Sequence, residues 1–131
     1  MKPDSNTSNQ EFKILVVDDE ENVLQSIRKV VESKIPQATV DSNSDPVLGL
    51  EMVKTNKYDL LIIDLMMPKC DGNEFIQKVK ESKLKLKIIM ITGYATNRAR
   101  AQAFRTGVDG YIEKPFTRKE LVSTILSFFD N

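Results

Sequence analysis

Two adjacent carboxylates, Asp18 and Asp19, directly follow the apolar run ILVV at residues 14–17. Acidic side chains repel each other and resist burial, so their place after a segment that suits a buried strand requires a compensating positive charge. A divalent cation supplies two positive charges and binds oxygen ligands, and Mg²⁺ suits an incomplete carboxylate shell beside solvent because it keeps several waters. The acidic pair therefore predicts a metal site.

Other polar residues also follow apolar runs: Asp64 follows LLII, Thr92 follows IIMI and Lys114 follows YIE. If these runs are parallel strands of one sheet, all of these side chains lie at its carboxyl edge, where α/β domains bind ligands. Neighbouring strands are ~4.8 Å apart, which would crowd Asp18, Asp19 and Asp64 together. Like charges ~4 Å apart repel by about 4 kcal/mol at an effective dielectric constant of ~20, so a cation is expected there. With the metal held by the acidic pair, Asp64 would be free to act on whatever the metal orients.

These polar residues must be positioned by short apolar runs that alternate with segments of helical periodicity. Continuous runs rich in branched residues favour strands that are covered on both faces. The strand candidates are residues 14–17, 38–40, 60–63, 88–91 and 111–113. Strands that alternate with helices form parallel sheets through right-handed crossovers, which place helices on both faces. The sequence thus predicts an α/β fold with a doubly wound five-stranded parallel sheet in the flavodoxin-like order 2-1-3-4-5.

Five helices are predicted from apolar residues at helical spacing. Their apolar positions are Val23, Leu24, Ile27, Val30 and Val31; Val47, Leu50 and Val53; Phe75, Ile76 and Val79; Ala99, Ala103 and Phe104; and Leu121, Val122, Ile125, Leu126 and Phe129. The fourth helix is expected over residues 97–105. The fifth, over residues 117–129, opens with the capping box TRKE.

Length and composition indicate one domain and exclude several classes of protein. A chain of 131 residues suits a single domain, and its 19 basic residues balance 19 acidic ones, so bulk charge gives no reason to expect nucleic-acid or membrane binding. With one cysteine, Cys70, and no histidine, the chain has no internal disulfide and no histidine-based triad or usual zinc site. These features favour a cytoplasmic protein.

The opening segment MKPDSNTSNQ differs from the rest of the chain. It is polar, lacks the apolar core of a signal peptide, and cannot bury enough surface to offset its ordering entropy. We expect a flexible N-terminal tail at residues 1–11 and one domain at 12–131. The chain would be either a single-domain protein or an excised piece of a longer one.

The motifs VVDDE, LIIDLMMPKCDG, MITG and YIEKPF together resemble the receiver domain of two-component response regulators, the CheY-like family, over residues 12–130. This resemblance implies that Asp64 is a phosphoacceptor. Asp64 would take a phosphoryl group from a phosphohistidine on a sensor histidine kinase or histidine phosphotransfer protein, giving an aspartyl phosphate. The domain would be a signalling module rather than an enzyme, although it would assist its own phosphorylation and dephosphorylation.

The resemblance also implies a ligand set for the metal. Asp19, Asp64 and the main-chain carbonyl of Met66 would bind Mg²⁺ directly, with Mn²⁺ as a substitute. Asp18 would act through a metal-bound water. In the family, these ligands hold the ion beside the phosphoryl group, where it disperses negative charge.

Further roles follow from the same resemblance. Thr92 and Lys114 would hold the phosphoryl oxygens, and main-chain N–H groups of Met66 and Gly93 would add donors. Tyr111 would turn inward when the threonine hydroxyl moves toward the phosphoryl group.

The resemblance implies two features around the lysine as well. The Lys114–Pro115 bond would be cis and would aim the ammonium into the site. The output surface would comprise the fourth helix, the fifth strand and the fifth helix, where a downstream effector domain or protein would bind.

Each site residue also has a purely structural interpretation. These are a helix N-cap for Asp18 and Asp19, a turn for Asp64, a local backbone bond for Thr92, a solvated loop charge for Lys114 and a half-buried strand position for Tyr111.

Three rival functions remain as alternatives. A haloacid-dehalogenase-like phosphatase also uses an aspartate nucleophile, but it needs a second aspartate two residues later, where this chain has Met66. A flavodoxin-like FMN carrier would bind a phosphate after the first strand, where the acidic residues 18–21 would repel it. A receiver-like interaction module that acts without phosphorylation is the third.

Overall fold

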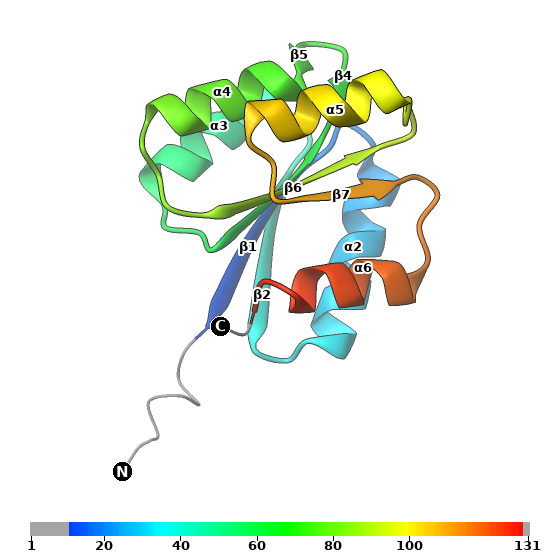
Figure 1. Ribbon diagram of the computed structural model, residues 1–131. Helices are drawn as coiled ribbons and strands as arrows, with labels where there is room; N and C mark the ends of the chain where they lie inside the picture. Colours follow the sequence, from blue (N-terminus) through cyan, green and yellow to red (C-terminus); the bar gives the residue numbers. More distant parts are fainter. Residues whose placement is uncertain (1–10, 130–131) are drawn as a thin grey trace.

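The structure is a computed structural model that describes residues 11–129, so the tail predicted at 1–11 lies outside the described residues except for Glu11. Five parallel strands form one sheet in the order β2-β1-β3-β6-β7 (Figure 1). Their bounds are β1 Phe12–Val17, β2 Ala38–Asn43, β3 Leu60–Asp64, β6 Lys87–Thr92 and β7 Gly110–Glu113. Because β6 and β7 are the fourth and fifth strands of this sheet, the predicted order 2-1-3-4-5 is confirmed.

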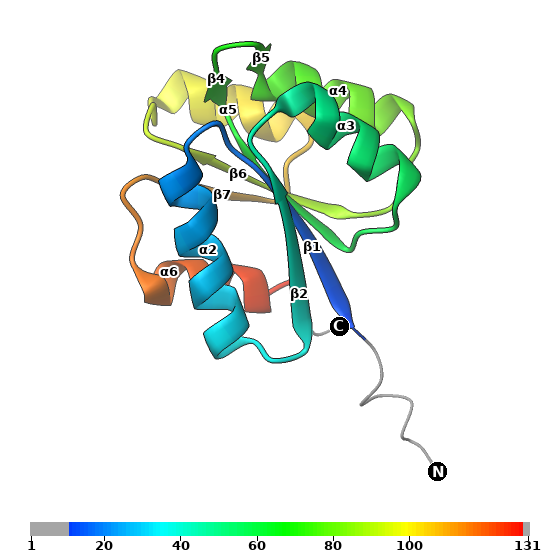
Figure 2. The same ribbon diagram turned by 180° about the vertical axis from the view of Figure 1, so that it is seen from behind.

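Helices cover both faces of the sheet, which confirms the doubly wound α/β architecture. Figures 1 and 2 show α3, α4 and α5 on one face and α2 and α6 on the other. Their bounds are α2 Glu21–Lys34, α3 Pro46–Thr55, α4 Gly72–Glu81, α5 Asn97–Thr106 and α6 Arg118–Leu126. A short antiparallel hairpin of β4 (Met66–Met67) and β5 (Cys70–Asp71), which was not predicted, precedes α4. Within residues 11–129, none of the helices has the length and apolar character needed to cross a membrane.

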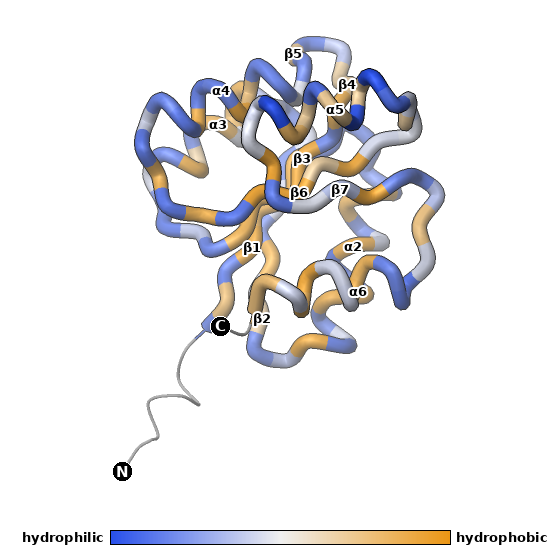
Figure 3. Tube along the Cα trace, in the orientation of Figure 1, coloured by the Kyte–Doolittle hydropathy of each residue, from blue (hydrophilic) through white to orange (hydrophobic). Residues whose placement is uncertain are grey.

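The core consists of two apolar clusters, one on each face of the sheet. Along β1, Leu15 and Val17 belong to the cluster beneath α3, α4 and α5, whereas Ile14 and Val16 belong to the cluster beneath α2 and α6. This alternation follows from the period of two along a strand. Because both faces are buried, the strands need continuous apolar runs, and Figure 3 shows this apolar character along the middle of the sheet.

Some of the predicted apolar stripes are wrong in detail. Val47 is 65% exposed and Phe104 is 43% exposed, so neither packs in the core as the spacing suggested. The buried face of α3 instead includes Gly49, because a Cβ atom there would lie 2.8 Å from Cγ2 of Val17. A hydrophobic pattern cannot identify a glycine that allows a helix to approach a strand so closely.

The ends of α6 agree only in part with the prediction. The capping box is confirmed: Thr117 Oγ1 accepts a hydrogen bond from Glu120 N at 3.0 Å, and Glu120 Oε1 accepts one from Thr117 N at 2.8 Å. The helix ends at Leu126 rather than at Phe129, and Leu126 is exposed. Leu121 and Ile125 are the fully buried residues of its apolar face.

Candidate functional site

The register of the sheet brings the predicted site residues to one edge. Val17 of β1 pairs with Ile63 of β3, so Asp18 and Asp64 follow at the same level on adjacent strands. On the other side, Thr92 is the last residue of β6, and its carbonyl accepts a hydrogen bond from the main-chain N–H of Lys114 at 2.8 Å. Four strands, β1, β3, β6 and β7, therefore end around one point.

A cluster of three carboxylates occupies this point. One oxygen atom from each of Asp18, Asp19 and Asp64 lies within 4.8 Å of the others; Asp18 and Asp64 are buried and Asp19 is exposed. Asp18 Oδ1 accepts a hydrogen bond from Glu20 N at 2.9 Å, whereas Oδ2 accepts none from the described residues. The N-cap of α2 is Glu20, which makes no side-chain capping bond, so the interpretation of the acidic pair as a helix cap is wrong.

Lys114 supplies the positive charge nearest to this cluster. Its Nζ atom lies 2.9 Å from Glu20 Oε1, 3.0 Å from Asp18 Oδ2 and 3.6 Å from Asp64 Oδ2. The contact with Asp18 is an ion pair whose geometry does not make it a hydrogen bond. The Lys114 side chain is only 17% exposed, so it is not the solvated loop charge of the structural interpretation.

Two local features accompany the lysine. The Lys114–Pro115 peptide bond is cis. Glu20, the partner of Lys114 at 2.9 Å, was not assigned to the site from the sequence. The only signal that could have identified it is its place in the acidic run at residues 18–21.

Burial and mutual repulsion perturb the carboxylates. Burial, together with the negative charge of Asp18, raises the pKa of Asp64 to about 6, although the Lys114 ammonium and a backbone hydrogen bond from Met66 oppose the shift. Burial also raises the pKa of Asp18, against the opposing effects of the Glu20 N–H and Lys114. Burial lowers the pKa of Lys114, but the hydrogen bond to Glu20 and the ion pair with Asp18 outweigh it and the pKa is raised. One ammonium therefore does not offset the cost of ionising both buried carboxylates.

The carboxylate cluster opens into a cleft of about 330 Å³, which has room for several waters at ~30 Å³ each. Thr92 is buried at the cleft wall, and its Oγ1 accepts a hydrogen bond from Tyr94 N at 2.8 Å. The local backbone bond of the structural interpretation is thus present, while the hydroxyl hydrogen remains available for donation. The residues that line the cleft are Asp19, Glu20, Asp64, Met66, Thr92, Gly93, Tyr94 and Lys114.

Gly72, the first residue of α4, allows the start of this helix to lie close to the main chain of Asp64. A Cβ atom at Gly72 would lie 2.5 Å from the main-chain oxygen of Asp64, so any side chain there would displace the strand end. Gly72 N donates to Leu65 O at 2.7 Å, and Asp71 caps α4 by accepting from Asn73 N at 2.7 Å. Within the motif LIIDLMMPKCDG, the final DG pair therefore fixes the backbone that carries Asp64.

Tyr111 lies outside the cleft. It is half-buried on β7, its ring centroid is 6.2 Å from that of Phe104, and Cζ of Arg100 lies 5.5 Å from the centroid of its ring. Its hydroxyl is buried and has no hydrogen-bond partner among the described residues. The position agrees with the structural interpretation of a half-buried strand aromatic.

Comparisons with known proteins agree with this arrangement. The family described as response regulator receiver domain matches residues 14–126. The chain is 40% identical over 114 residues to the transcriptional regulatory protein ResD of Bacillus subtilis. The matched region covers 86% of this chain and 45% of ResD. The chain thus spans about half the length of the curated relatives it matches.

Solved structures show the same likeness. The CheY-like receiver domain protein of Methanospirillum hungatei JF-1 superposes with a TM-score of 0.83 at 27% identity, covering 89% of this chain and 92% of that one. A receiver domain protein of Clostridium thermocellum gives a TM-score of 0.79 at 30% identity, covering 89% and 93%. With its sheet order, the acidic edge beside Lys114 and these relatives, the chain belongs to the receiver domain family of two-component response regulators.

Proposed function

We propose that this receiver domain accepts a phosphoryl group on Asp64 from the phosphohistidine of a sensor histidine kinase or histidine phosphotransfer protein. One oxygen of Asp64 attacks phosphorus while the bond from phosphorus to the imidazole nitrogen breaks, and an aspartyl phosphate forms. The observation that carries this proposal is a buried carboxylate in an open cleft, with two more carboxylates within 4.8 Å and Lys114 Nζ at 3.6 Å. Phosphoryl transfer depends on positive charge and hydrogen-bond donors around the transferred oxygens.

The carboxylate cluster fits a bound Mg²⁺. Its donors are all oxygens, and Asp18 Oδ2 is buried without a hydrogen-bond donor among the described residues. Asp19, Asp64 and the main-chain carbonyl of Met66 would hold the ion, with Asp18 acting through a water, and Mn²⁺ can replace it. When bound, the ion would supply the positive charge that the cluster lacks and would stabilise charge on the transferred oxygens.

Other residues of the cleft would hold the phosphoryl group. Lys114 is protonated and already lies against Asp64, so it can bind a phosphoryl oxygen after a small movement. The Thr92 hydroxyl can donate to a second oxygen. Met66 and Gly93 line the same cleft, and their main-chain N–H groups would add donors.

We propose that the modification biases a two-state element. Phosphorylation replaces one carboxylate charge by about −1.5 to −2 and adds strong acceptors, which favours the conformer in which Thr92 and Lys114 close on the phosphoryl group. The buried hydroxyl of Tyr111 has no hydrogen-bond partner within residues 11–129, and a group in that state costs about 1–3 kcal/mol, so a second position for this ring is energetically accessible. Thr92→Ala is expected to retain phosphorylation but to lose the conformational response.

The proposed output surface comprises α5, β7 and α6, the fourth helix, fifth strand and fifth helix. It carries the exposed ring of Phe104, with Arg100 stacked over both Phe104 and Tyr111. An exposed apolar ring beside the switch aromatic suits a surface for a downstream effector domain or protein. We do not expect this domain to bind nucleic acid directly, because its net charge is zero.

The phosphoacceptor assignment can be tested with acetyl phosphate and Mg²⁺, followed by intact mass spectrometry. The chain should gain one phosphoryl group, and Asp64→Asn or chelation of the metal should abolish the gain. Asp59→Asn is the matched control, because Asp59 lies at the other end of β3 and its amide replacement can still accept from Lys13 N. Labelling of Asp64→Asn at the wild-type level would refute the assignment.

Two rival functions make different demands on the site. A phosphatase of the dehalogenase type would need an acid where the cleft has Met66, whose thioether cannot transfer a proton. An interaction module that acts without phosphorylation would bind its effector equally well before and after acetyl phosphate treatment.

A further inference from the structure

A basic recess lies at the amino edge of the sheet, at the opposite ends of β3 and β6 from the carboxylate cluster. It has a volume of about 490 Å³ and is lined by residues 53–58 and 83–85, which lead into β3 and β6. Figures 1 and 2 show these two segments side by side where the chain leaves α3 and α4. We refer to the space between them as the amino-edge recess.

Positive charge dominates the amino-edge recess. Its lining includes four lysines and no acidic residue: Lys54, Lys57, Lys83 and Lys85. All four are exposed, and within residues 11–129 none of them makes an ion pair or a side-chain hydrogen bond. The carboxylate of Asp59, two positions after Lys57, instead accepts a hydrogen bond from the main-chain N–H of Lys13. The lysines are therefore available to an acidic ligand.

Local structure accounts for only one of these lysines. Lys54 lies in the last turn of α3, where the helix macrodipole favours a cation. Lys83 has a φ of 57°, a left-handed backbone conformation that favours glycine or asparagine, so the turn after α4 does not itself favour a lysine. Lys57 and Lys85 lie beyond the ends of α3 and α4. Three of the four charges thus have no evident role in the local fold.

The segment that leads into β6 also has unpaired main-chain groups. Burial alternates along residues 83–87, since Leu84 and Leu86 are half-buried and the lysines between and beside them are exposed. A period of two is typical of an extended chain. Within residues 11–129, the main-chain N–H and C=O groups of Leu84, Lys85 and Leu86 make no hydrogen bond. An extended peptide that lies beside this segment can pair with these groups as an added strand.

The floor of the amino-edge recess is apolar and is held by the core. Val53 and Tyr58 are buried in the apolar cluster beneath α3, α4 and α5, and Leu84 packs against that cluster. The Tyr58 hydroxyl donates a hydrogen bond to Asp41 Oδ2 at 2.6 Å, which fixes the ring. Core packing therefore sets the positions of both walls, and less conformational entropy is lost when a ligand binds such a preformed site.

We propose that the amino-edge recess binds an extended acidic segment of a partner protein. Acidic side chains of the segment pair with the four lysines, and alternate apolar side chains lie on Val53 and Leu84. The main chain of the segment pairs with residues 84–86. This inference does not rest on the phosphoacceptor assignment, because the recess and Asp64 lie at opposite ends of β3.

The recess suits an acidic peptide better than a nucleic-acid strand or a small anion. Single-stranded nucleic acid is commonly bound by stacking of its bases on aromatic rings. The aromatic residue that lines the recess, Tyr58, is buried and so offers no stacking surface. A small anion would leave the main-chain groups of residues 84–86 without partners.

The probe is the peptide EVEVEVE, acetylated and amidated, which is titrated into the full ¹⁵N-labelled chain without divalent metal. The expected result is a saturable set of amide shifts centred on residues 54–58 and 83–87, with Thr92 and Gly93 unaffected. Lys83→Gln combined with Lys85→Gln should weaken binding about tenfold, since two ion pairs to the peptide are lost.

Two controls separate the charge of the recess from its other features. Lys69→Gln combined with Lys119→Gln removes the same charge from exposed positions outside the recess, and it should change the dissociation constant by less than about twofold. The peptide with N-methylated valines keeps its charges but loses main-chain donors, so it should bind at least about fivefold more weakly.

Several outcomes would overturn the proposal. Shifts that do not saturate, or an equal loss of affinity in the two double variants, would mean general attraction to surface charge. Equally tight binding of the neutral peptide QVQVQVQ would show that acidic side chains are not recognised. Tighter binding of a single-stranded oligothymidine at the same residues would assign the recess to nucleic acid. If the double variant in the recess does not fold, Lys57→Gln serves as the second variant. Acetyl phosphate labelling of Asp64 is measured separately, so failure here leaves that assignment unaffected.

Discussion

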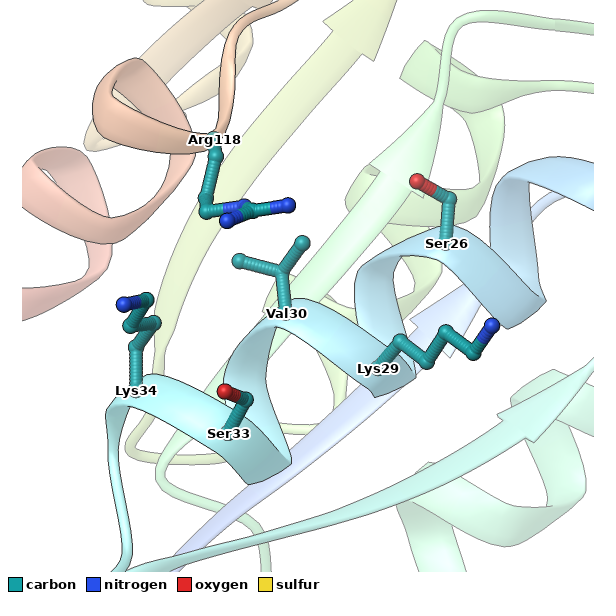
Figure 4. Close-up of a pocket in the computed structure, with 6 residues that line it drawn as sticks. All are labelled: Ser26, Lys29, Val30, Ser33, Lys34 and Arg118. Carbon is teal, nitrogen blue, oxygen red and sulfur yellow. The ribbon is translucent and has the colours of Figure 1, made fainter.

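The carboxylate cluster and the groove between α2 and α6 both gather like charges, but they do so under different conditions. The groove is lined by Ser26, Lys29, Val30, Ser33, Lys34 and Arg118 (Figure 4). In the cluster, two of the three carboxylates are buried, and Lys114, which directly follows β7, lies among them. In the groove, the lining cations are exposed and no described residue neutralises them. Water and salt weaken repulsion between exposed charges, whereas buried charges keep most of it.

The charges of the cluster therefore affect the free energy of unfolding strongly, whereas the charges of the groove should affect it little. Burial raises the pKa of Asp64 to about 6, so the protein loses free energy of unfolding by keeping that group ionised at neutral pH. The groove cations are exposed, so we expect their removal to have little effect on stability.

Removal of the internal cation should have the largest effect. Lys114→Ala should slow phosphorylation by acetyl phosphate about 100-fold, because a preorganised charge that contacts the transferred oxygens is lost. Labelling rates followed by mass spectrometry give the measurement, and circular dichroism checks that the fold is retained. Lys69→Ala, at an exposed position on the nearby hairpin, is the control and should react at the wild-type rate. A wild-type rate in Lys114→Ala would remove the lysine from the mechanism.

Removal of one buried negative charge should weaken metal binding and stabilise the metal-free protein. Asp18→Asn should weaken Mg²⁺ binding about tenfold and raise the melting temperature of the metal-free protein by about 2–4 °C, since desolvation of the charge is relieved. Titration calorimetry and thermal unfolding measure the two effects.

The control for this variant separates charge from hydrogen bonding. Asp18→Ala removes the charge together with the acceptor for Glu20 N, so it should be less stable than Asp18→Asn. A lower melting temperature with unchanged Mg²⁺ affinity in Asp18→Asn would contradict the prediction.

The metal-free protein should become more stable as the pH falls. The folded-state pKa of Asp64, about 6, lies above the ordinary value of 3.8, so the folded state binds the proton more tightly between these values. From about pH 7 to pH 5, this group should add about 1 kcal/mol to the free energy of unfolding, or about 3 °C in melting temperature. In Asp64→Asn this part of the pH dependence should disappear, and an unchanged profile would show that another group titrates.

Removal of one groove cation should have the smallest effect on the protein itself. Arg118→Gln should change the melting temperature by less than about 2 °C and leave the rate of Asp64 phosphorylation unchanged, because exposed substitutions usually cost less than about 0.5 kcal/mol. Lys114→Ala and Arg118→Gln each remove one positive charge, so their direct comparison isolates the effect of burial. A similar loss of stability in both variants would break the contrast.

The sequence was most informative where function and fold impose the same local pattern. The apolar runs that end at Val17 and Ile63 are fully buried on both faces. A strand buried in this way needs a continuous apolar run, so the composition of these runs was enough to predict central strands of the sheet. The residue after each run then had to lie at the carboxyl edge. The positions of Asp18, Asp64 and Lys114 along the chain were therefore sufficient to group them at one site.

The sequence was misleading where burial depends on a neighbour rather than on periodicity. Phe104 fits the helical spacing of α5, yet it lies exposed beside Tyr111 under Arg100. Gly49 does not contribute to an apolar pattern, yet it faces Val17 directly. In both cases the outcome depends on the distance between a helix and its neighbours, which local spacing does not contain.

The class of fold, the order of its elements and the edge at which the acidic residues meet follow from the sequence, because strand and helix periods are local properties of the chain. The contact of Glu20 with Lys114, 94 positions away, and the reach of Arg118 over α2 are seen only once the chain is folded. Such contacts form when helices and strands pack against one another. A side chain's partners then depend on the register and separation of segments that are far apart in the sequence, and local sequence does not encode either quantity.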